Sequence, residues 1–314
     1  MKRIIISVED FETNAAVIEN DKFIHFFTEK KTYARAGDVF KGKVSKTVSN
    51  MNFVFVDTGD KRPSFLSETE YFEAPGIEFG ELVNGDNGVV EYRPAVDVAA
   101  MFEKGRELMV QVTKEAYSTK GARLTTNITL AGHFSVFCPY LKHIGISRRI
   151  EKDEERSRLK KMAAEIREKL GNDFGVILRT QASGANAAEI EEEIRRLHSD
   201  WTEINDKFKK KKGPGLIRAE QPSHISVLRE YLDSSIKEVI TNDRETFEKI
   251  KKYIYGVKNI KAKTILHAGA EEIFEHYGYT GQVESLFGTI TSFKKGGYIK
   301  TVSYTHLTLP TKRI

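Results

Sequence analysis

The chain has 314 residues, a length that predicts two or three domains. Of these residues 39% are hydrophobic and 30% are charged, which is typical of a globular protein. No stretch approaches the roughly 20 consecutive apolar residues of a membrane span or the apolar core of a signal peptide. The single cysteine, Cys138, excludes an internal disulfide and a paired-cysteine metal site, so we expect a cytoplasmic protein. The net charge of +5 favours acidic partners only weakly.

The first 130 residues predict mostly β-structure. Residues 2–8 form an apolar run, and residues 15–27 hold two extended stretches around the turn residues 19–22. From residue 39 to 66 the pattern is one of short strands separated by Gly and Pro. A polar, glycine-containing stretch over residues 67–98 predicts a long surface loop, and we expect further strands at residues 107–113 and 122–130.

The second half mixes helices and strands. Apolar side chains with helical spacing predict a helix over residues 157–170, and Gly171 ends it. Residues 174–180 predict a buried strand, followed by a long amphipathic helix that ends in a lysine run and at Gly213-Pro214-Gly215, a candidate domain boundary. Beyond it we expect three elements: a helix over residues 223–232, a strand over 238–241 and a helix over 244–255. The fold class is therefore α+β.

The segment Lys41–Leu66 is basic and aromatic. It contains five basic residues and two acidic ones, a net charge of +3. Strand alternation places Val54 and Val56 on one face and Phe53 and Phe55 on the other. Rings beside lysines suit single-stranded nucleic acid, because bases stack on the rings and cations follow the phosphates. The alternative is that Phe53 and Phe55 cover a second core or a domain interface, and the pattern alone does not separate the two.

Arg179 and Thr180 stand where a predicted buried strand runs into a loop of Ser, Gly and Asn. A guanidinium fork with a hydroxyl and loop amides can hold a terminal phosphate. The alternative is that Arg179 pairs with an acid of the following helix, where Glu189 and residues 191–193 are available.

Other candidate sites are weaker. The eight histidines show no metal-ligand spacing, and no phosphate-binding P-loop motif is present. Glu9 and Asp10 end the first predicted strand, and we expect a structural role for them. The lysines at 209–212 are typical of a solvated helix end.

Four motifs stand in order along the chain. The first is the S1 type of OB barrel pattern, which is resembled by the strings FKGKV, FVDTG and SFL together. With the other three, TKGARLTT, ISRRIE and VILRTQA, the chain resembles the bacterial ribonuclease E/G family from residue 1 to about residue 299. The resemblance implies an α+β multidomain fold: an RNase H-like domain with an inserted S1/OB-type β-barrel, an α/β 5′-sensor domain and the start of a DNase I-like domain. The implied ranges are 1–37 and 216–284 for the RNase H-like domain, 38–126 for the barrel with its long loop, 127–215 for the sensor, 285–300 for the start of the DNase I-like domain and 301–314 for a non-native tail.

The resemblance also implies roles for single residues. Phe55 and Phe65 match aromatic residues that stack on RNA, and Lys120 matches a lysine that contacts RNA on the same domain. Arg179 and Thr180 match the pocket for the 5′-monophosphate of RNA. Two further matches, Arg148 and Arg149, are implied to contact the RNA backbone, whereas the role of Phe53 stays open.

The resemblance implies a catalytic Mg²⁺ held by carboxylates beyond Gly296-Gly297. At the matching positions the chain has Tyr304, Thr305 and Thr311, and no Asp or Glu follows Thr301. This tail resembles a translated sequencing adaptor, so we expect the chain to bind RNA without cutting it. A divergent member with its metal ligands elsewhere is the alternative.

The implied partner is single-stranded RNA, cut with a 5′-monophosphate preference in rRNA processing or mRNA decay. No membrane span is expected, and oligomers are expected only of the intact parent enzyme. Two further readings stay open at this stage: a non-catalytic S1-domain RNA-binding protein, or a β segment that serves only as an interface.

Overall fold

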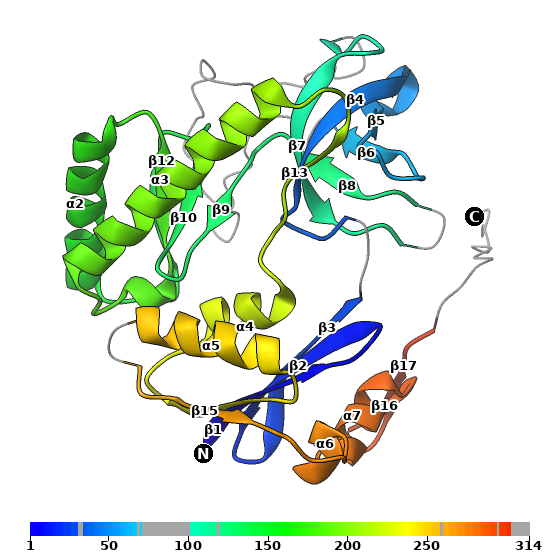
Figure 1. The fold of residues 1–314 in the computed structure, drawn as a ribbon, viewed down its shortest axis with the longest axis vertical. Helices are drawn as coiled ribbons and strands as arrows, with labels where there is room; N and C mark the ends of the chain where they lie inside the picture. Colours follow the sequence, from blue (N-terminus) through cyan, green and yellow to red (C-terminus); the bar gives the residue numbers. More distant parts are fainter. Residues whose placement is uncertain are drawn as a thin grey trace, which may run out of the picture. The chain divides into compact units, whose positions relative to one another are not determined.

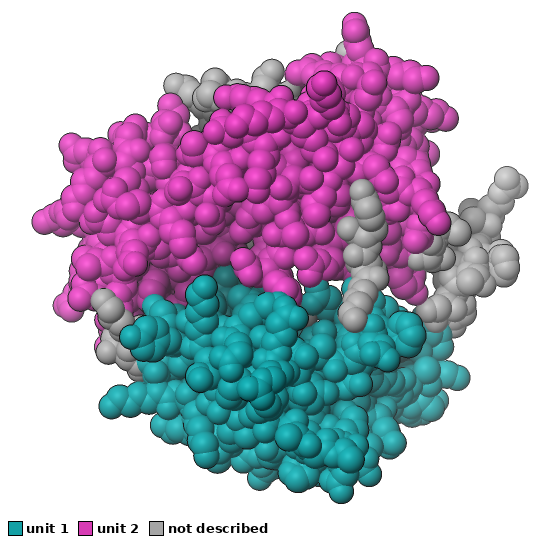
Figure 2. All heavy atoms as spheres, viewed as in Figure 1, with its two compact units in different colours: residues 1–30, 223–314 teal, residues 31–222 magenta. Residues whose placement is uncertain are grey.

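The computed structural model describes residues 1–30, 34–67, 70, 101–117, 120–257, 260–293 and 295–302, without the side chain of Ser223. The chain forms two compact units (Figure 2). Unit 1 comprises Met1–Lys30 and Ser223–Ile314, and unit 2 comprises Lys31–Pro222. Nearly all of the predicted loop at 67–98, and the tail from residue 303 on, lie outside the described residues.

Unit 1 is built on a five-stranded sheet with the order β15-β14-β1-β2-β3. The strands are β1 (Lys2–Val8), β2 (Glu12–Glu19), β3 (Lys22–Lys30), β14 (Ile236–Thr241) and β15 (Lys263–Leu266). β1 runs parallel to β14 and antiparallel to β2, so the sheet is mixed. Asn20 and Asp21 have φ of 51° and 59°, the left-handed conformation that a tight hairpin requires, and the predicted turn is confirmed.

Helices cover both faces of this sheet (Figure 1). The helices α4 (Ser223–Tyr231) and α5 (Arg244–Gly256) pack with Ile4 and Ile6 in one buried cluster. The short helix α6 (Ile273–His276) packs with Ile5 in the other, and α7 (Thr280–Phe287) follows it. Alternate isoleucines of β1 therefore serve opposite cores, as expected of a central strand. The hairpin of β16 (Ile290–Ser292) and β17 (Tyr298–Lys300) follows.

Unit 2 contains a closed five-stranded barrel, consistent with an OB/S1-like domain. Its strands pair in the cycle β4-β5-β6-β8-β7-β4. They are β4 (Val39–Val48), β5 (Phe53–Asp57), β6 (Ser64–Ser67), β7 (Glu107–Lys114) and β8 (Arg123–Thr125), with the 3-10 turn η1 (Ser49–Met51) between the first two. The barrel interior is apolar and includes Phe40, Val54, Val56, Leu66 and Leu124.

One strand prediction needs a correction. The stretch expected as one strand over residues 122–130 forms β8 in the barrel and then β9 (Leu130–Ala131) in another sheet. The amide of Ile128 bonds to the carbonyl of Thr126, which turns the chain between the two strands. Because both halves are apolar and extended, their composition gives no sign of the break.

The rest of unit 2 is an α/β layer. Its sheet has the order β11-β12-β10-β9, with β10 (Ser135–Cys138), β11 (Ile144–Ile146) and β12 (Gly175–Leu178). The 3-10 turn η3 (Thr180–Ala182) follows β12. Two helices, α2 (Asp153–Leu170) and α3 (Ala187–Lys210), bury their apolar faces in one cluster with this sheet. The helix predicted over residues 157–170 is confirmed and begins four residues earlier.

Several contacts join the barrel to the α/β layer, and barrel residues Val39 and Met109 pack in the buried cluster of that layer. The strand β13 (Gly215–Arg218) pairs with β4. Lys41 of β4, only 6% exposed, donates from Nζ to the carbonyl of Lys211 at 2.9 Å and forms an ion pair with Glu107 at 2.7 Å. The same ammonium lies 4.9 Å from the ring centroid of Phe208 near the end of α3. Lys41, one of the five basic residues counted in the segment Lys41–Leu66, is therefore buried and used inside the protein.

The described part of the chain has no helix both long and apolar enough to cross a membrane.

His224 of α4 gives unit 1 a pH-dependent stability. Its side chain is 6% exposed, and burial, together with the nearby charge of Lys249, lowers its pKa from 6.5 to about 4. Below pH 6.5 the unfolded chain binds a proton that the folded chain excludes. The free energy of unfolding is therefore expected to fall between pH 6.5 and 4, by up to about 3 kcal/mol from this group.

Urea unfolding of the parent chain and of His224→Gln, followed between pH 7 and pH 4, measures this contribution. The variant should lose less free energy of unfolding than the parent over that pH range. Equal pH slopes for the two proteins would contradict the assignment.

Candidate nucleic-acid interface

Three phenylalanine rings line the outer face of the barrel. Phe55 of β5 lies opposite Phe65 of β6 in the antiparallel register. The ring centroid of Phe53 is 5.2 Å from that of Phe55 and 6.3 Å from that of Phe65. All three rings are half-buried, whereas Val54 and Val56 between them are fully buried. The predicted alternation along this strand is confirmed.

These rings cover no second core. None of the four buried apolar clusters among the described residues includes Phe53, Phe55 or Phe65, either as a core member or as a packed neighbour. Half-exposed rings that contact one another are available to a planar ligand.

Exposed cations lie on β4, which pairs with the ring-bearing strand β5, and on the connection between the two strands that carry the rings. Lys46 pairs with Phe55 across β4 and β5, and Lys43 pairs with Asp57 in the same register. Both lysines are exposed, as are Lys61 and Arg62 in the connection from β5 to β6. The cation set predicted from the sequence is thus present at the surface, except for Lys41.

Lys120 is exposed and stands next to this connection. The following residue, Gly121, packs so closely on the backbone carbonyl of Pro63 that a Cβ atom would collide with it. The amide of Phe65 bonds to the carbonyl of Ala122 at 2.9 Å. The Lys-Gly-Ala segment is therefore fixed against the strand that carries Phe65, and glycine is required for that approach.

The arginines and Thr180 gather at one edge of the α/β sheet. β11 and β12 are parallel, so the residues that follow them meet at the same edge. The amide of Ser147 bonds to the carbonyl of Leu178 at 2.8 Å, and the hydroxyls of Ser147 and Thr180 lie 3.0 Å apart. The exposed Arg148 and Arg149 follow Ser147 directly.

Arg179 is half-buried and oriented by the turn between β9 and β10. Its Nη1 donates to the carbonyl of Gly132 at 2.9 Å, and its own amide donates to the carbonyl of Phe134 at 2.8 Å. Two hydrogen bonds to this turn therefore fix the backbone of Arg179 and one nitrogen of its guanidinium group.

The buried carboxylate of Glu193 also binds the turn between β9 and β10. It accepts hydrogen bonds from the amides of His133, Phe134 and Ser135 at 2.6, 2.9 and 2.9 Å, and from the hydroxyl of Ser135 at 2.8 Å. A Cβ atom on residue 132 would collide with this carboxylate, so a larger residue there would have to displace Glu193 from the turn.

Three of the four acids of α3 that were considered as partners of Arg179 have other contacts. Glu189 accepts from the amide of Asn186 in a capping box. Glu191 pairs with Lys169 and Arg195, both at 2.9 Å. Glu193 binds the 133–135 turn.

The loop after Thr180 has an anchor of its own. Glu155 accepts from the amide of Gly184 at 2.8 Å and forms a two-pronged ion pair with Arg158 at 2.7 Å. The hydrogen bonds from Arg158, and then that from Gly184, lower the pKa of Glu155 to about 2. The anchor is therefore ionised over the whole physiological pH range.

Reasoning from the sequence missed Gly132 and Ser147, and it considered Glu193 only as a direct partner of Arg179. One signal was present for Glu193, which is three residues after Ile190 and four before Leu197, on the buried stripe of a long helix. A carboxylate on such a stripe requires buried donors. Ser147 and Gly132 gave no comparable signal.

The described residues do not form a metal site. No group of three or more His, Cys, Asp or Glu side chains that could hold an ion occurs among them. Glu9, at the end of β1, instead accepts a hydrogen bond from Ser7 at 2.6 Å. The residues described therefore do not fit the implied magnesium.

Comparison with known proteins shows the relationship. The family model described as "Ribonuclease E/G family" matches residues 129–303. Ribonuclease G of Escherichia coli K12 is 29% identical over 298 residues, which are 94% of this chain and 59% of that protein. Ribonuclease E of Haemophilus influenzae is 29% identical over 303 residues, 95% of this chain and 31% of that protein.

A putative ribonuclease E of Buchnera aphidicola is 28% identical over 314 residues, 97% of this chain and 72% of that protein. The chain spans about three-fifths of the length of the ribonuclease G relatives that it matches. Because the family model covers more than half of the sequence, the chain belongs to the ribonuclease E/G family.

Proposed function

We propose that this chain is the RNA-holding portion of an endoribonuclease that cuts single-stranded RNA and prefers a 5′-monophosphate. The observation that carries the proposal is the outer face of the barrel, where Phe55 and Phe65 stand opposite each other among exposed lysines. Family membership supports RNA as the ligand.

Stacking explains why such a face prefers unpaired RNA. Bases of a single strand are free to lie on aromatic rings, whereas paired bases are stacked on one another. Lys43, Lys46 and Lys120 carry compact charges on flexible stems, which follow phosphates without reading sequence. In this proposal the barrel binds RNA of any sequence.

We call the site formed by Arg179 and Thr180 the Arg-Thr corner. Its geometry supports the proposed recognition of a terminal phosphate. A phosphate monoester carries up to two charges and three acceptor oxygens, more than an internal phosphodiester. The guanidinium of Arg179 and the adjacent hydroxyls of Ser147 and Thr180 offer charge-assisted and neutral donors to such a group. Arg148 and Arg149 would then contact the phosphates that follow.

The finer domain assignment is part of the same proposal. We infer an RNase H-like domain from unit 1, whose mixed sheet is covered on both faces, and a 5′-sensor domain from the α/β layer of unit 2. The β16–β17 hairpin would begin the DNase I-like domain. The compartment we propose is the cytoplasm, the RNA classes are rRNA precursors and mRNA, and the intact enzyme would use Mg²⁺ and assemble into oligomers.

The first prediction concerns the barrel rings. Phe55→Ala combined with Phe65→Ala should weaken binding of a single-stranded RNA by about 2–6 kcal/mol if the two rings stack independently. Fluorescence anisotropy with a 3′-labelled oligonucleotide measures the change. Phe11→Ala, which removes an 85% exposed ring from unit 1, is the matched control. Unchanged affinity of the double variant would show that the barrel face binds no RNA.

The second prediction concerns the Arg-Thr corner. Arg179→Gln and Thr180→Val, made separately, should each reduce the preference for 5′-monophosphate over 5′-hydroxyl RNA. The reduction should be about tenfold for Arg179→Gln, because a hydrogen bond to a charged group contributes about 1.5–3 kcal/mol. The loss should be smaller for Thr180. Arg195→Gln, an exposed change on α3, serves as the control. If both variants keep the parent's preference, the phosphate lies elsewhere.

The third prediction concerns catalysis by this 314-residue chain. We expect it to bind 5′-monophosphorylated RNA and to leave it uncut in Mg²⁺, since residues 301–314 supply no carboxylate. Gel analysis of a labelled RNA against a buffer control measures cleavage. Turnover that depends on Mg²⁺ and exceeds the control would refute the expectation and point to ligands elsewhere in the chain.

A further inference from the structure

The segment Arg244–Thr264 of unit 1 holds a concentration of positive charge that the proposed function does not use. It contains seven basic and two acidic residues, a net charge of +5, which equals the net charge of the whole chain. The segment comprises α5 and the approach to β15. Charge so concentrated requires a polyanionic partner or an extensive solvent shell.

Little of this charge is neutralised within the protein. Lys249 pairs with Glu245 at 2.6 Å, one turn earlier on α5. Lys251, Lys252, Lys261 and Lys263 are all exposed, and none has an ion pair within the described part of the chain.

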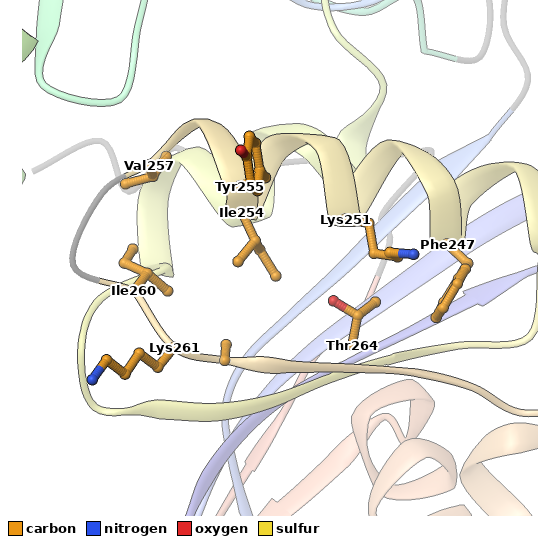
Figure 3. Close-up of a pocket in the computed structure, with 9 residues that line it drawn as sticks. Phe247, Lys251, Ile254, Tyr255, Val257, Ile260, Lys261 and Thr264 are labelled. Atoms are coloured by element: carbon orange, nitrogen blue, oxygen red, sulfur yellow. The ribbon is translucent and has the colours of Figure 1, made fainter.

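A pocket of about 690 Å³ lies between α5 and β15 in the middle of this charge (Figure 3). Its apolar lining includes Phe247, Ile254 and Ile260, and its polar lining includes Lys251, Lys261 and Thr264. We call this surface the α5–β15 groove. Lys251 stands over the ring of Phe247, 5.6 Å from its centroid, so the ammonium borders the apolar lining.

Tyr255 adds an aromatic surface to the groove. It lines the pocket and is 93% exposed. A tyrosine so fully exposed gains nothing from burial in the folded chain, whereas a ligand ring stacked on it removes both surfaces from water.

We propose that the α5–β15 groove is a second contact site for single-stranded RNA, on the unit that does not contain the barrel. A base would lie against the apolar lining or on Tyr255, and its flanking phosphates would meet Lys251 and Lys261. The combination of ring, apolar lining and lysines on both elements favours a nucleic-acid strand over an acidic peptide, because a peptide offers charge but no regular series of planar rings.

The inference rests on the proposed function only for the nature of the ligand. RNA held at two separate surfaces gains affinity from both, provided that one strand reaches both. A short oligonucleotide and a long one therefore distinguish independent from joint binding.

The test uses the full chain in four forms: the parent, a barrel variant (Phe55→Ala, Phe65→Ala), a groove variant (Lys251→Gln, Tyr255→Ala, Lys261→Gln) and their combination. Fluorescence anisotropy with single-stranded RNA is measured over a range of salt concentrations. The groove variant should bind at least about fivefold more weakly, since one stacked base is lost. Its salt dependence should also fall, by about 1.4 in the slope of log K against log salt for two lost phosphate contacts.

The control matches the groove variant in charge and ring count. Phe11→Ala, Lys30→Gln and Lys237→Gln remove one exposed ring and two exposed lysines elsewhere on unit 1 and should leave affinity closer to the parent's. If the triple groove variant melts at a lower temperature than the parent, Tyr255→Ala alone repeats the measurement, because its side chain makes few contacts to lose. Photo-crosslinking of RNA that contains 4-thiouridine should recover peptides between residues 247 and 264.

The outcomes separate the two proposals. If the barrel variant keeps parental affinity while the groove variant loses it, the groove stands and the barrel assignment fails. If the groove variant matches the control in affinity and salt slope and no crosslink maps to it, the groove proposal is overturned. It is also overturned if polyglutamate competes as well as RNA, which identifies an acidic peptide site, or if a free mononucleotide competes equally, which identifies a nucleotide site.

Discussion

The buried ammonium of Lys41 links the barrel to the end of α3, where it adds a charged contact to the apolar cluster that the barrel shares with the α/β layer. An ammonium that is 6% exposed is stable only when charge and hydrogen bonds replace its water, and here Glu107 and the carbonyl of Lys211 do so. The position also suits the negative end of the α3 dipole. Removing the ammonium would leave Glu107 and the helix carbonyls without their donor.

The helix that Lys41 contacts, α3, also positions Arg179. Glu193, near the other end of α3, binds three amides of the 133–135 turn, and that turn holds Arg179. A buried carboxylate that accepts from three amides and a hydroxyl is held in place, since losing one of these bonds would leave a buried polar group unsatisfied. The arginine that we assign to the RNA terminus is thus supported by contacts that never touch RNA.

Strand alternation divides the barrel residues between the interior and the outer face. Val54, Val56 and Leu66 fill the interior, and the phenylalanines between them contact one another outside. Stacking needs no sequence-specific donors, so a barrel face of this kind and the α5–β15 groove would both accept RNA of varied sequence. Selection between RNA molecules would then fall to the Arg-Thr corner, which distinguishes chain ends by charge.

Short-range patterns in the sequence determined much of the fold and the chemistry of the candidate site. The alternation at residues 53–57, the turn at 19–22 and the helix over 157–170 depend on residues within one or two turns of each other, so one sequence suffices to find them. The family motifs indicated Phe55, Phe65, Arg179 and Thr180, and the structure brings Phe55 opposite Phe65 and Thr180 beside Ser147. What those residues bind was a hypothesis of the sequence and stays one.

Only the tertiary structure decided which charges are available and which are used internally. Lys41 contacts a carbonyl 170 positions away, Glu193 bonds to an amide 60 positions away and Ser147 meets Thr180 across 33 positions. The break in the strand predicted over residues 122–130 likewise depends on which sheet each half joins. Such contacts depend on how the chain folds back on itself, and they cannot be predicted from the local periodicity of the sequence.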